Sequence, residues 1–217
     1  EENITYADAG EVVTISVVIL NDGAITSEET PVAFWLGNPN EEGSEQIGEA
    51  TTDVLNPDVT TTVNIDWQVI PGQHEIYVYI DPEEATTDRN RRNNLRHAAL
   101  QVIPNLVLSE INVDRDNPLV EEEITVTAIV INNGGADAGA FIVEFWNGNP
   151  ENEESEVFGE VNIDGVDREN PTTVHADYSA TEGIQELWVV ANPQFDLIEE
   201  DSTDNRRTLQ LRVLPDL

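Results

Sequence analysis

The stretch FWLGNPNEEGSEQIGE at residues 34–49 recurs as FWNGNPENEESEVFGE at residues 145–160, with ten of the sixteen positions identical. The two stretches lie 111 residues apart, and the same offset aligns the rest of the chain without a gap. Alternating apolar residues agree in this register, since Val13 and Ile15 match Ile124 and Val126. The chain therefore contains two copies of one domain, which is typical of spacers and arrays and unusual for an enzyme.

Within each copy the hydrophobic period is two residues, which indicates β-strands. Segments that alternate or run apolar occur at residues 11–20, 31–36, 61–67, 75–80 and 98–102 of the first copy. Turn signals such as NDG, GNP and IPG separate them, and no ten-residue window shows a convincing amphipathic helix. This pattern predicts an all-β fold of two tandem immunoglobulin-like β-sandwich domains, with about seven strands each.

The segment VIPNL at residues 102–106 recurs as VLPDL at residues 213–217 and marks the domain boundaries. We assign the first domain to residues 1–103, the second to 104–214, and the start of a possible third repeat to 215–217. In the second copy PNLVLSEI supplies a first strand, which the first copy lacks. We expect either a segment of a longer array or a subunit that receives this strand from a neighbouring molecule, which would build a filament by strand exchange.

The charge balance is extreme, with 44 acidic residues against nine basic ones, all of them Arg, and a net charge of −35. Such a surface would repel nucleic acids and anionic membranes, which argues against both as partners. It would hold hydrated cations, as in a salt-adapted halophilic protein or a calcium-rich setting; the alternative is plain solubility through self-repulsion. The chain has no Cys, and no apolar run approaches the length that spans a bilayer.

Dense carboxylates in the repeated loop at residues 37–45 and 148–156 make it the first candidate metal site. Glu41, Glu42 and Glu45 follow a turn-forming Gly-Asn-Pro and could bind calcium through oxygen atoms at low affinity. The loop lacks the spacing of a preorganised calcium loop, and the alternative is a solvated hairpin loop kept soluble by its charge.

The second candidate is the long connection before the last strand, at residues 81–94 and 192–205. In an immunoglobulin-like sandwich this loop lies at the N-terminal pole, so that of the second copy is expected near the linker at 104–106 and near the acidic loop of the first copy. A calcium ion could then join the domains; the alternative is a pair of mobile loops neutralised by salt. The carboxylates concerned are Asp196, Glu199, Asp201 and Asp204.

A third candidate is DRDNP at residues 114–118, where Asp114, Asp116 and Asn117 resemble half a calcium loop. Short Asp/Asn-Pro turns are common, and this is the alternative. We expect no cofactor to be required and calcium to be the one ion worth testing.

Nothing in either copy indicates catalysis. His74, His97 and His175 have no His counterpart in the other copy, and neither a phosphate-binding glycine loop nor an HExxH motif is present. Carboxylates are so abundant that no pair can be singled out as a glycosidase dyad. We therefore expect that the chain is not an enzyme.

Two smaller features could serve binding or modification. The pairs Phe34-Trp35 and Phe145-Trp146 lie mid-strand, so one member of each faces the core and the other faces outward. An outward Trp could stack on a sugar ring, although structural use is more common. Asn3, in the sequon NIT, is a candidate N-glycosylation site.

Several motifs together resemble the CARDB domain, the cell-adhesion-related domain found in bacteria and archaea. They are an alternating strand leading into N-x-G, then V-x-F-W-x-G-N-P, IGE or FGE, a Trp or Tyr at the end of a later strand, and a closing D/N-P…N-N. The second copy departs from the last motif, with Asp204-Asn205 in place of Asn93-Asn94. The resemblance covers both copies almost end to end. It implies immunoglobulin-like sandwiches that occur as tandem repeats on cell-surface proteins, with no catalytic constellation.

We therefore expect a non-catalytic extracellular module of the cell surface, acting in cell adhesion as a structural spacer or filament-forming repeat. Its partners would be neighbouring copies of itself, or cell-surface proteins and glycans. The alternative is a glycan- or protein-binding module of a surface or secreted protein. A third possibility is an accessory domain appended to a secreted hydrolase.

Overall fold

The computed structural model describes residues 5–168 and 170–216. The chain divides into two compact units, unit 1 of Glu1–Val102 and unit 2 of Ile103–Leu217, and each is described by itself. The regular elements in the described ranges are β-strands apart from one short 3-10 turn, and none of them is a helix long and apolar enough to cross a membrane.

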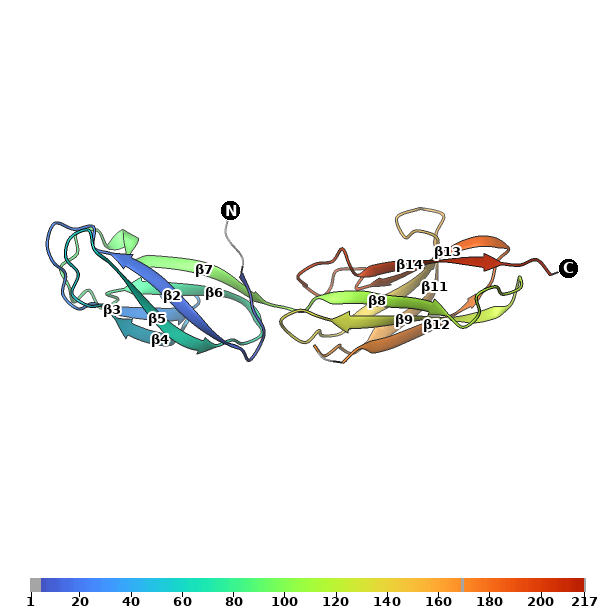
Figure 1. The fold of residues 1–217 in the computed structure, drawn as a ribbon, viewed down its shortest axis with the longest axis horizontal. Helices are drawn as coiled ribbons and strands as arrows, with labels where there is room; N and C mark the ends of the chain where they lie inside the picture. Colours follow the sequence, from blue (N-terminus) through green and yellow to red (C-terminus); the bar gives the residue numbers. More distant parts are fainter. Residues whose placement is uncertain (1–4, 169, 217) are drawn as a thin grey trace. The chain divides into compact units, whose positions relative to one another are not determined.

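Unit 2 is a sandwich of two sheets, as Figure 1 shows. One sheet has the strand order β11-β10-β13-β14 and the other β12-β9-β8, and all neighbouring pairs are antiparallel. The strands are β8 (Leu106–Val113), β9 (Glu123–Asn132), β10 (Phe141–Asn147), β11 (Glu156–Ile163), β12 (Thr172–Ser179), β13 (Gly183–Ala191) and β14 (Arg206–Val213).

The core of unit 2 lies between these sheets, because every second residue of each strand points inward. Val126 of β9, Phe145 of β10 and Leu187 of β13 are completely excluded from solvent. Strand β8 closes the core at one edge with Leu106 and Leu108, which are 0% and 1% exposed. Each such side chain contributes about 1.5–3 kcal/mol through burial of apolar surface.

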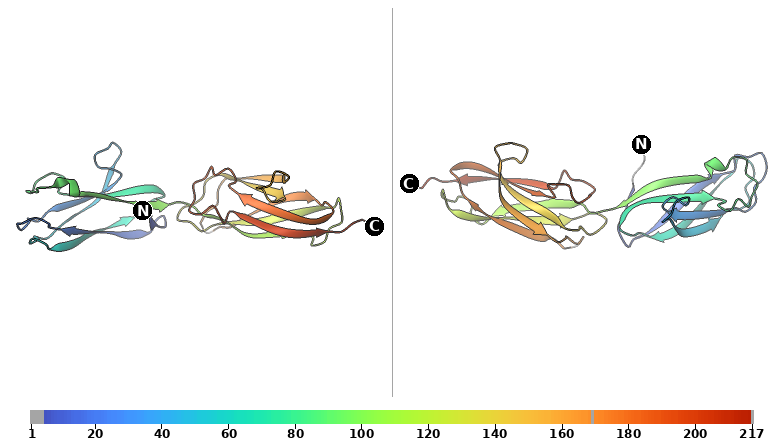
Figure 2. Two further views of the ribbon diagram at one scale, coloured as in Figure 1. Left: turned by 90° about the horizontal axis from the view of Figure 1, so that it is seen from above. Right: turned by 180° about the vertical axis from the view of Figure 1, so that it is seen from behind.

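In its described residues, unit 1 repeats this plan without a counterpart of β8. Its sheets have the orders β1-β7-β6-β3-β4 and β2-β5, and both layers can be followed in the further views of Figure 2. The elements are β1 (Thr5–Tyr6), β2 (Val12–Leu20), β3 (Pro31–Leu36), β4 (Glu45–Thr51), β5 (Thr60–Gln68), β6 (Gly72–Ile80), the 3-10 turn η1 (Arg91–Asn93) and β7 (Leu95–Val102). The prediction of two tandem immunoglobulin-like sandwiches is confirmed.

Strand β8, the first strand of unit 2, contributes to the burial of the core. A comparison of its neighbour β9 with the equivalent strand β2 of unit 1 shows this. Ile124 and Val126 of β9 are 2% and 0% exposed, whereas their counterparts Val13 and Ile15 are only partly buried. In unit 2 β9 is flanked on both sides, but in the described part of unit 1 β2 pairs with β5 alone. The core of unit 1 is consequently smaller and open along β2.

Candidate functional site

The segment that joins the units, residues 103–105, is built into one end of unit 2. Ile103, Pro104 and Asn105 are all buried, although they belong to neither β7 nor β8. Their three carbonyl oxygens accept hydrogen bonds of 2.8–3.0 Å from the backbone N–H groups of Gly135, Glu200 and Asn133. A buried loop needs partners for its backbone groups, and here the neighbouring loops of unit 2 supply them.

The turn after β9 shapes the place where this segment lies. The Oδ1 atom of Asn132 accepts hydrogen bonds from the backbone N–H groups of Asn105 (3.1 Å) and Gly134 (3.2 Å). Its Nδ2 group donates to the carbonyl oxygens of Ala136 and Val166, so this buried side chain uses both ends. A Cβ on Gly134 would lie 2.2 Å from the Asn105 nitrogen, so only glycine permits this approach.

The acidic loop between β13 and β14 closes the connection from the other side. Glu199 Oε2 accepts the Leu106 N–H at 3.0 Å, and its Oε1 accepts the side-chain amides of Asn192 and Asn205 at 2.7 and 2.6 Å. Glu200 Oε1 accepts the Gly135 N–H at 3.2 Å. The loop therefore lies against the linker of its own unit. Both oxygen atoms of the Glu199 carboxylate accept hydrogen bonds from N–H donors there.

The other predicted ligands of this loop are arranged differently. The Asp201 carboxylate accepts hydrogen bonds from the hydroxyl and backbone N–H groups of Thr203, and the hydroxyl bond is the larger cause of its lowered pKa. Burial and the charge of Asp201 raise the pKa of Asp204, which accepts a long hydrogen bond from Asn105. Asp196 is exposed. Among the described residues no three His, Asp or Glu side chains form a metal-binding group, and calcium ligation here stays a prediction.

The corresponding loop of unit 1 is closed by an ion pair whose carboxylate is buried. Asp81 is 1% exposed and accepts hydrogen bonds from the N–H groups of Ala85 and Thr86, the Thr86 hydroxyl and the Arg91 guanidinium. Arg91 also donates to the Thr86 carbonyl oxygen. Burial alone would raise the pKa of Asp81, but the hydrogen bonds from Thr86 and Arg91 lower it from 3.8 to about 2.

Unit 2 closes the corresponding turn without this ion pair. Asn192 replaces Asp81 and Ser202 replaces Arg91, while the backbone keeps its left-handed conformation, with φ of 52° at Asp81 and 49° at Asn192. The Asn192 amide donates to the Leu197 carbonyl oxygen, the counterpart of the Thr86 oxygen that Arg91 reaches. One neutral amide thus takes over the donor role of the guanidinium.

This ion pair makes unit 1 sensitive to acid. Because the pKa of Asp81 is lower in the folded unit than the ordinary 3.8, ionised Asp81 stabilises the fold above about pH 4, and this contribution of about 2 kcal/mol is lost as pH falls toward 2. Hydrogen exchange of unit 1 amides between pH 5 and 2 measures the loss. The Asp81→Asn variant should show a smaller loss over this range, and an equal loss in both proteins would contradict the assignment.

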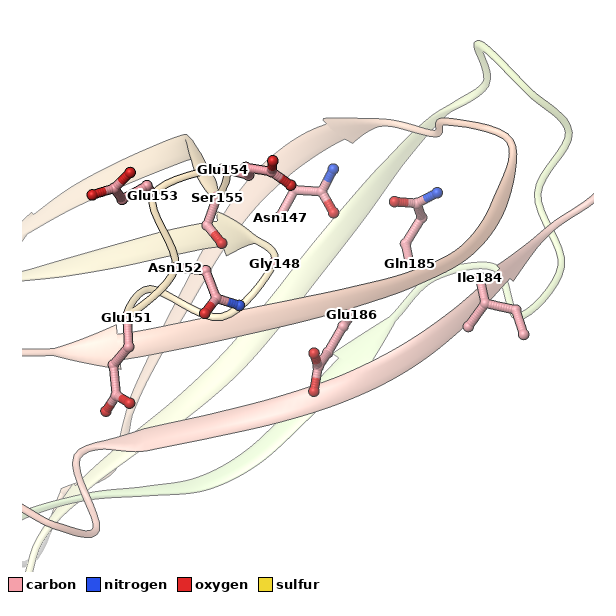
Figure 3. Close-up of a pocket in the computed structure, with 10 residues that line it drawn as sticks. All are labelled: Asn147, Gly148, Glu151, Asn152, Glu153, Glu154, Ser155, Ile184, Gln185 and Glu186. Atoms are coloured by element: carbon pink, nitrogen blue, oxygen red, sulfur yellow. The ribbon is translucent and has the colours of Figure 1, made fainter.

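An acid-lined hollow occurs at the same place in both units, between the Gly-Asn-Pro loop and the start of β6 in unit 1 or of β13 in unit 2. In unit 2 the loop after β10 arches beside β13, as Figure 3 shows. The Gly148 N–H donates to the Glu186 carbonyl oxygen at 2.8 Å, and Gly37 makes the same bond to Glu75 at 2.9 Å. The carboxylates that line the two hollows are those of Glu151, Glu153, Glu154 and Glu186 in unit 2 and of Glu41, Glu45 and Glu75 in unit 1.

The remaining predicted ligands are placed apart from this hollow. Glu42 is exposed and does not line it. Asp114 accepts the Thr125 N–H at 2.9 Å, while Asp116 and Asn117 are exposed in the loop between β8 and β9. Within the described part of the chain, no third His, Asp or Glu side chain forms a metal-binding group with Asp114 and Asp116. The glycosylation candidate Asn3 lies outside the described residues.

The outward face of the larger sheet has an aromatic pair in each unit. Phe34 and Phe145 are fully buried, and their neighbours Trp35 and Trp146 are half-buried on the other face, as the alternation predicts. Trp146 is directly opposite Trp188, and Trp35 is directly opposite Tyr77. Tyr77 also stacks on the exposed ring of His97, with 4.9 Å between ring centres.

Sequence reasoning missed two structural features, the close packing at Gly134 in unit 2 and the ion pair of Asp81 and Arg91 in unit 1. The role of Gly134 depends on a backbone 29 to 31 residues earlier in the chain, and periodicity carries no such information. The ion pair of Asp81 and Arg91 lies in the connection at residues 81–94, for which the sequence suggested a calcium site or, as the alternative, a mobile loop neutralised by salt. The sequence did contain a usable signal for this pair, because both residues are replaced in the second copy, Asp81 by Asn192 and Arg91 by Ser202.

The fold and this site define a class of protein, a tandem pair of immunoglobulin-like repeats whose connection is built into the second repeat. A family model for CARDB matches residues 1–98 and 103–209. The chain therefore belongs to the CARDB family and is a cell-surface-related module.

Solved structures give matches of the same kind. The CARDB domain of a Pyrococcus furiosus protein, in complex with di-metal ions, is 16% identical over 52% of this chain and 90% of its own, with a TM-score of 0.45. A domain of a putative cell surface protein from Methanosarcina acetivorans is 23% identical over 52% of this chain and 93% of its own, with a TM-score of 0.42. No curated protein matches the sequence.

Proposed function

We propose that the chain is a non-catalytic structural spacer of the extracellular surface, a repeat in an array that carries load along the polypeptide. The observation that supports this most is the built-in connection. Strand β7 ends at Val102, and the carbonyl oxygen of Ile103 already accepts the Gly135 N–H at 2.8 Å. Load entering unit 2 through the chain therefore meets these hydrogen bonds at the first residue of the unit.

Single-molecule pulling on the chain between two handles tests this role. We expect two unfolding events, with unit 2 opening at the higher force because its connection and β8 must be sheared from several partners together. Asn132→Ala, which removes the acceptor of the Asn105 N–H, should lower the force of the unit 2 event alone. Asn21→Ala is the matched control in unit 1. If both units yield at the lowest measurable force, a load-carrying role is wrong.

A binding role is the second candidate, supported by the aromatic pairs. Trp146 with Trp188, and Trp35 with Tyr77, present half-buried rings on the outward face of the same sheet in both units. Flat rings beside carboxylates suit the stacking and hydroxyl contacts of a surface glycan. Titration of the intrinsic Trp fluorescence with an oligosaccharide panel, compared with Trp188→Ala, tests it. A panel that leaves the wild-type spectrum unchanged removes this candidate.

Cation dependence is proposed on the strength of the acid-lined hollows and the loop at the pole of unit 2. We expect a calcium-specific rise in melting temperature at sub-millimolar calcium if the carboxylates bind the ion individually. Thermal melts in calcium and sodium chloride at matched ionic strength, with and without chelator, measure it. A rise that follows ionic strength alone would instead assign the acidic surface to salt adaptation.

A further inference from the structure

The larger sheet of unit 2 ends in two strands of opposite charge. In the described residues β14 is the last strand at one side of the order β11-β10-β13-β14, and β11 is the last strand at the other. Strand β14 reads RRTLQLRV, with three of the nine Arg residues of the chain and no Asp or Glu. Strand β11 reads EVFGEVNI, with two Glu and no Arg. The sheet therefore has a basic edge and an acidic edge.

Both edge strands have an open outer side in the part of the chain that the structure describes. Strand β14 pairs with β13 alone, and the bridge of Leu214 to Leu119 lies just past its end. Strand β11 pairs with β10 alone. An open edge is a template for a strand of another chain, and charges along the edge exclude strands of the same sign.

The register of the sheet brings one charged residue of each edge into the same cross-strand row. Read from β11 to β14, this row consists of Glu160, Glu144, Val190 and Arg206. The next row on the same face consists of Val157, Trp146, Trp188 and Thr208. The residues at both ends of both rows are exposed, so the two edges present them outward at matching heights.

The directions of the edge strands allow the sheet to be continued by a sideways shift. Each neighbouring pair is antiparallel, so β11 and β14 run in opposite directions. A second copy shifted by the width of the sheet therefore places its β11 antiparallel to β14, with the same face outward. Its Glu160 then lies opposite Arg206, with about 4.5–5.5 Å between the Cβ atoms. Its Val157 lies opposite Thr208.

The side chains at these edges are free to make the exchange. Arg206 contacts Glu151 of its own acidic loop, but the two side chains are 46% and 66% exposed, and ion pairs at such positions are weak. Val157 is 45% exposed, and a strand added beside it would cover this apolar surface. Unit 1 lacks the basic partner, because its equivalent row ends in Glu49 on β4 and Leu95 on β7.

We propose that unit 2 associates side by side with unit 2 of a second copy, by antiparallel pairing of β14 in one chain with β11 in the other. Charge complementarity selects this partner, because Arg206 meets Glu160. The contact leaves one edge of each outer copy open, so copies add in an open series. This lateral contact goes beyond the proposed spacer, which carries load along a single polypeptide.

Sedimentation velocity of the full chain tests the contact. Because the net charge of −35 repels copies over about 30 Å in 0.01 M salt but only about 8 Å in 0.15 M salt, association should be stronger at the higher concentration. An edge contact is small, so chain concentrations of about 0.1–1 mM are used. We expect an open series of species above the monomer. Hydrogen exchange should show added protection along β11 and β14, and none along β4.

Reversal of single charges identifies the paired strands. Arg206→Glu and Glu160→Arg should each weaken association at least tenfold, because two charges of the same sign then lie opposite each other. An equal mixture of these two variants, or the double variant, should associate as the wild-type chain does, because each restores an Arg opposite a Glu. Glu49→Arg, at the equivalent edge position of unit 1, is the matched control and should leave association unchanged.

The outcomes decide between this contact and its absence. A wild-type chain that stays monomeric at these concentrations overturns the proposal. Association that survives both single reversals, or that neither the mixture nor the double variant restores, overturns the pairing of β14 with β11. These results are independent of the unfolding forces of the two units, which test the spacer role separately.

Discussion

Replacement of Gly134 by Ala should destabilise unit 2 by about 3 kcal/mol, at the upper end of the usual cost of overpacking. The added methyl group would lie 2.2 Å from the Asn105 nitrogen and 2.6 Å from the Ile103 carbonyl oxygen. Both are backbone atoms held by hydrogen bonds, so neither can turn away as a flexible side chain would. Hydrogen exchange in increasing denaturant measures the loss and assigns it to unit 2.

The matched control for this experiment is Gly23→Ala, at the same place in unit 1. There the nearest atom to the new Cβ is the side-chain Oδ1 of Asn21, at 3.0 Å. We expect a change within about 1 kcal/mol in either direction, since Ala also restricts the unfolded chain. Equal losses at both glycines would show that the turn itself, and not the connection packed on it, requires glycine.

Removal of the Asp81 side chain should destabilise unit 1 by about 3 kcal/mol, because it leaves the Arg91 guanidinium and the Thr86 N–H without their acceptor. Asp81→Ala is the variant, and the unfolding of unit 1 in denaturant is the measurement. Arg91→Ser should cost less than this, since its side chain is 26% exposed and the remaining carboxylate keeps three other donors.

The double variant with Asp81→Asn and Arg91→Ser imitates the arrangement in unit 2 and gives a sharper test. Its amide could donate to the Thr86 carbonyl oxygen, as Asn192 does to that of Leu197. We expect it to lose less stability than the sum of the single variants, by about 1 kcal/mol or more. Strict additivity would mean that the two loops are closed by unrelated interactions.

Much of the architecture could be predicted because it depends on local, repeated chemistry. Alternation predicts the strands and places Phe34 and Phe145 in the core, with Trp35 and Trp146 on the opposite face. Strand β4, with its bulge opposite Phe34 and Trp35, is an exception. Its mixture of Glu, Gly and Thr has a weak period, and it forms because β3 offers an edge to pair with.

The position of the candidate site was predictable, but the hydrogen bonds of its carboxylates were not. Sandwich topology placed the loop of Glu199 at the linker, and there it lies. Metal binding was inferred from the density of carboxylates and stays a prediction. In the structure Glu199 accepts N–H groups of Leu106, Asn192 and Asn205, and Glu200 accepts that of Gly135. Which acceptor meets which donor depends on atoms that are nearly a hundred residues apart in the chain.

The sequence by itself determined that the chain holds two repeats of all-β class, because a 111-residue offset and a two-residue period are properties of residue order. The family was indicated by the resemblance of its motifs to CARDB domains. Only the tertiary structure decided which structural role each individual residue has. Gly134 lies against the backbone of residues 103–105, while a Cβ at the equivalent Gly23 would meet only the Asn21 side chain. The physical reason is that burial and hydrogen-bond partners are set by what packs against a residue. Equivalent turns in the two units therefore differ, because in the described residues the segment leading into β8 packs on the turn of unit 2 alone.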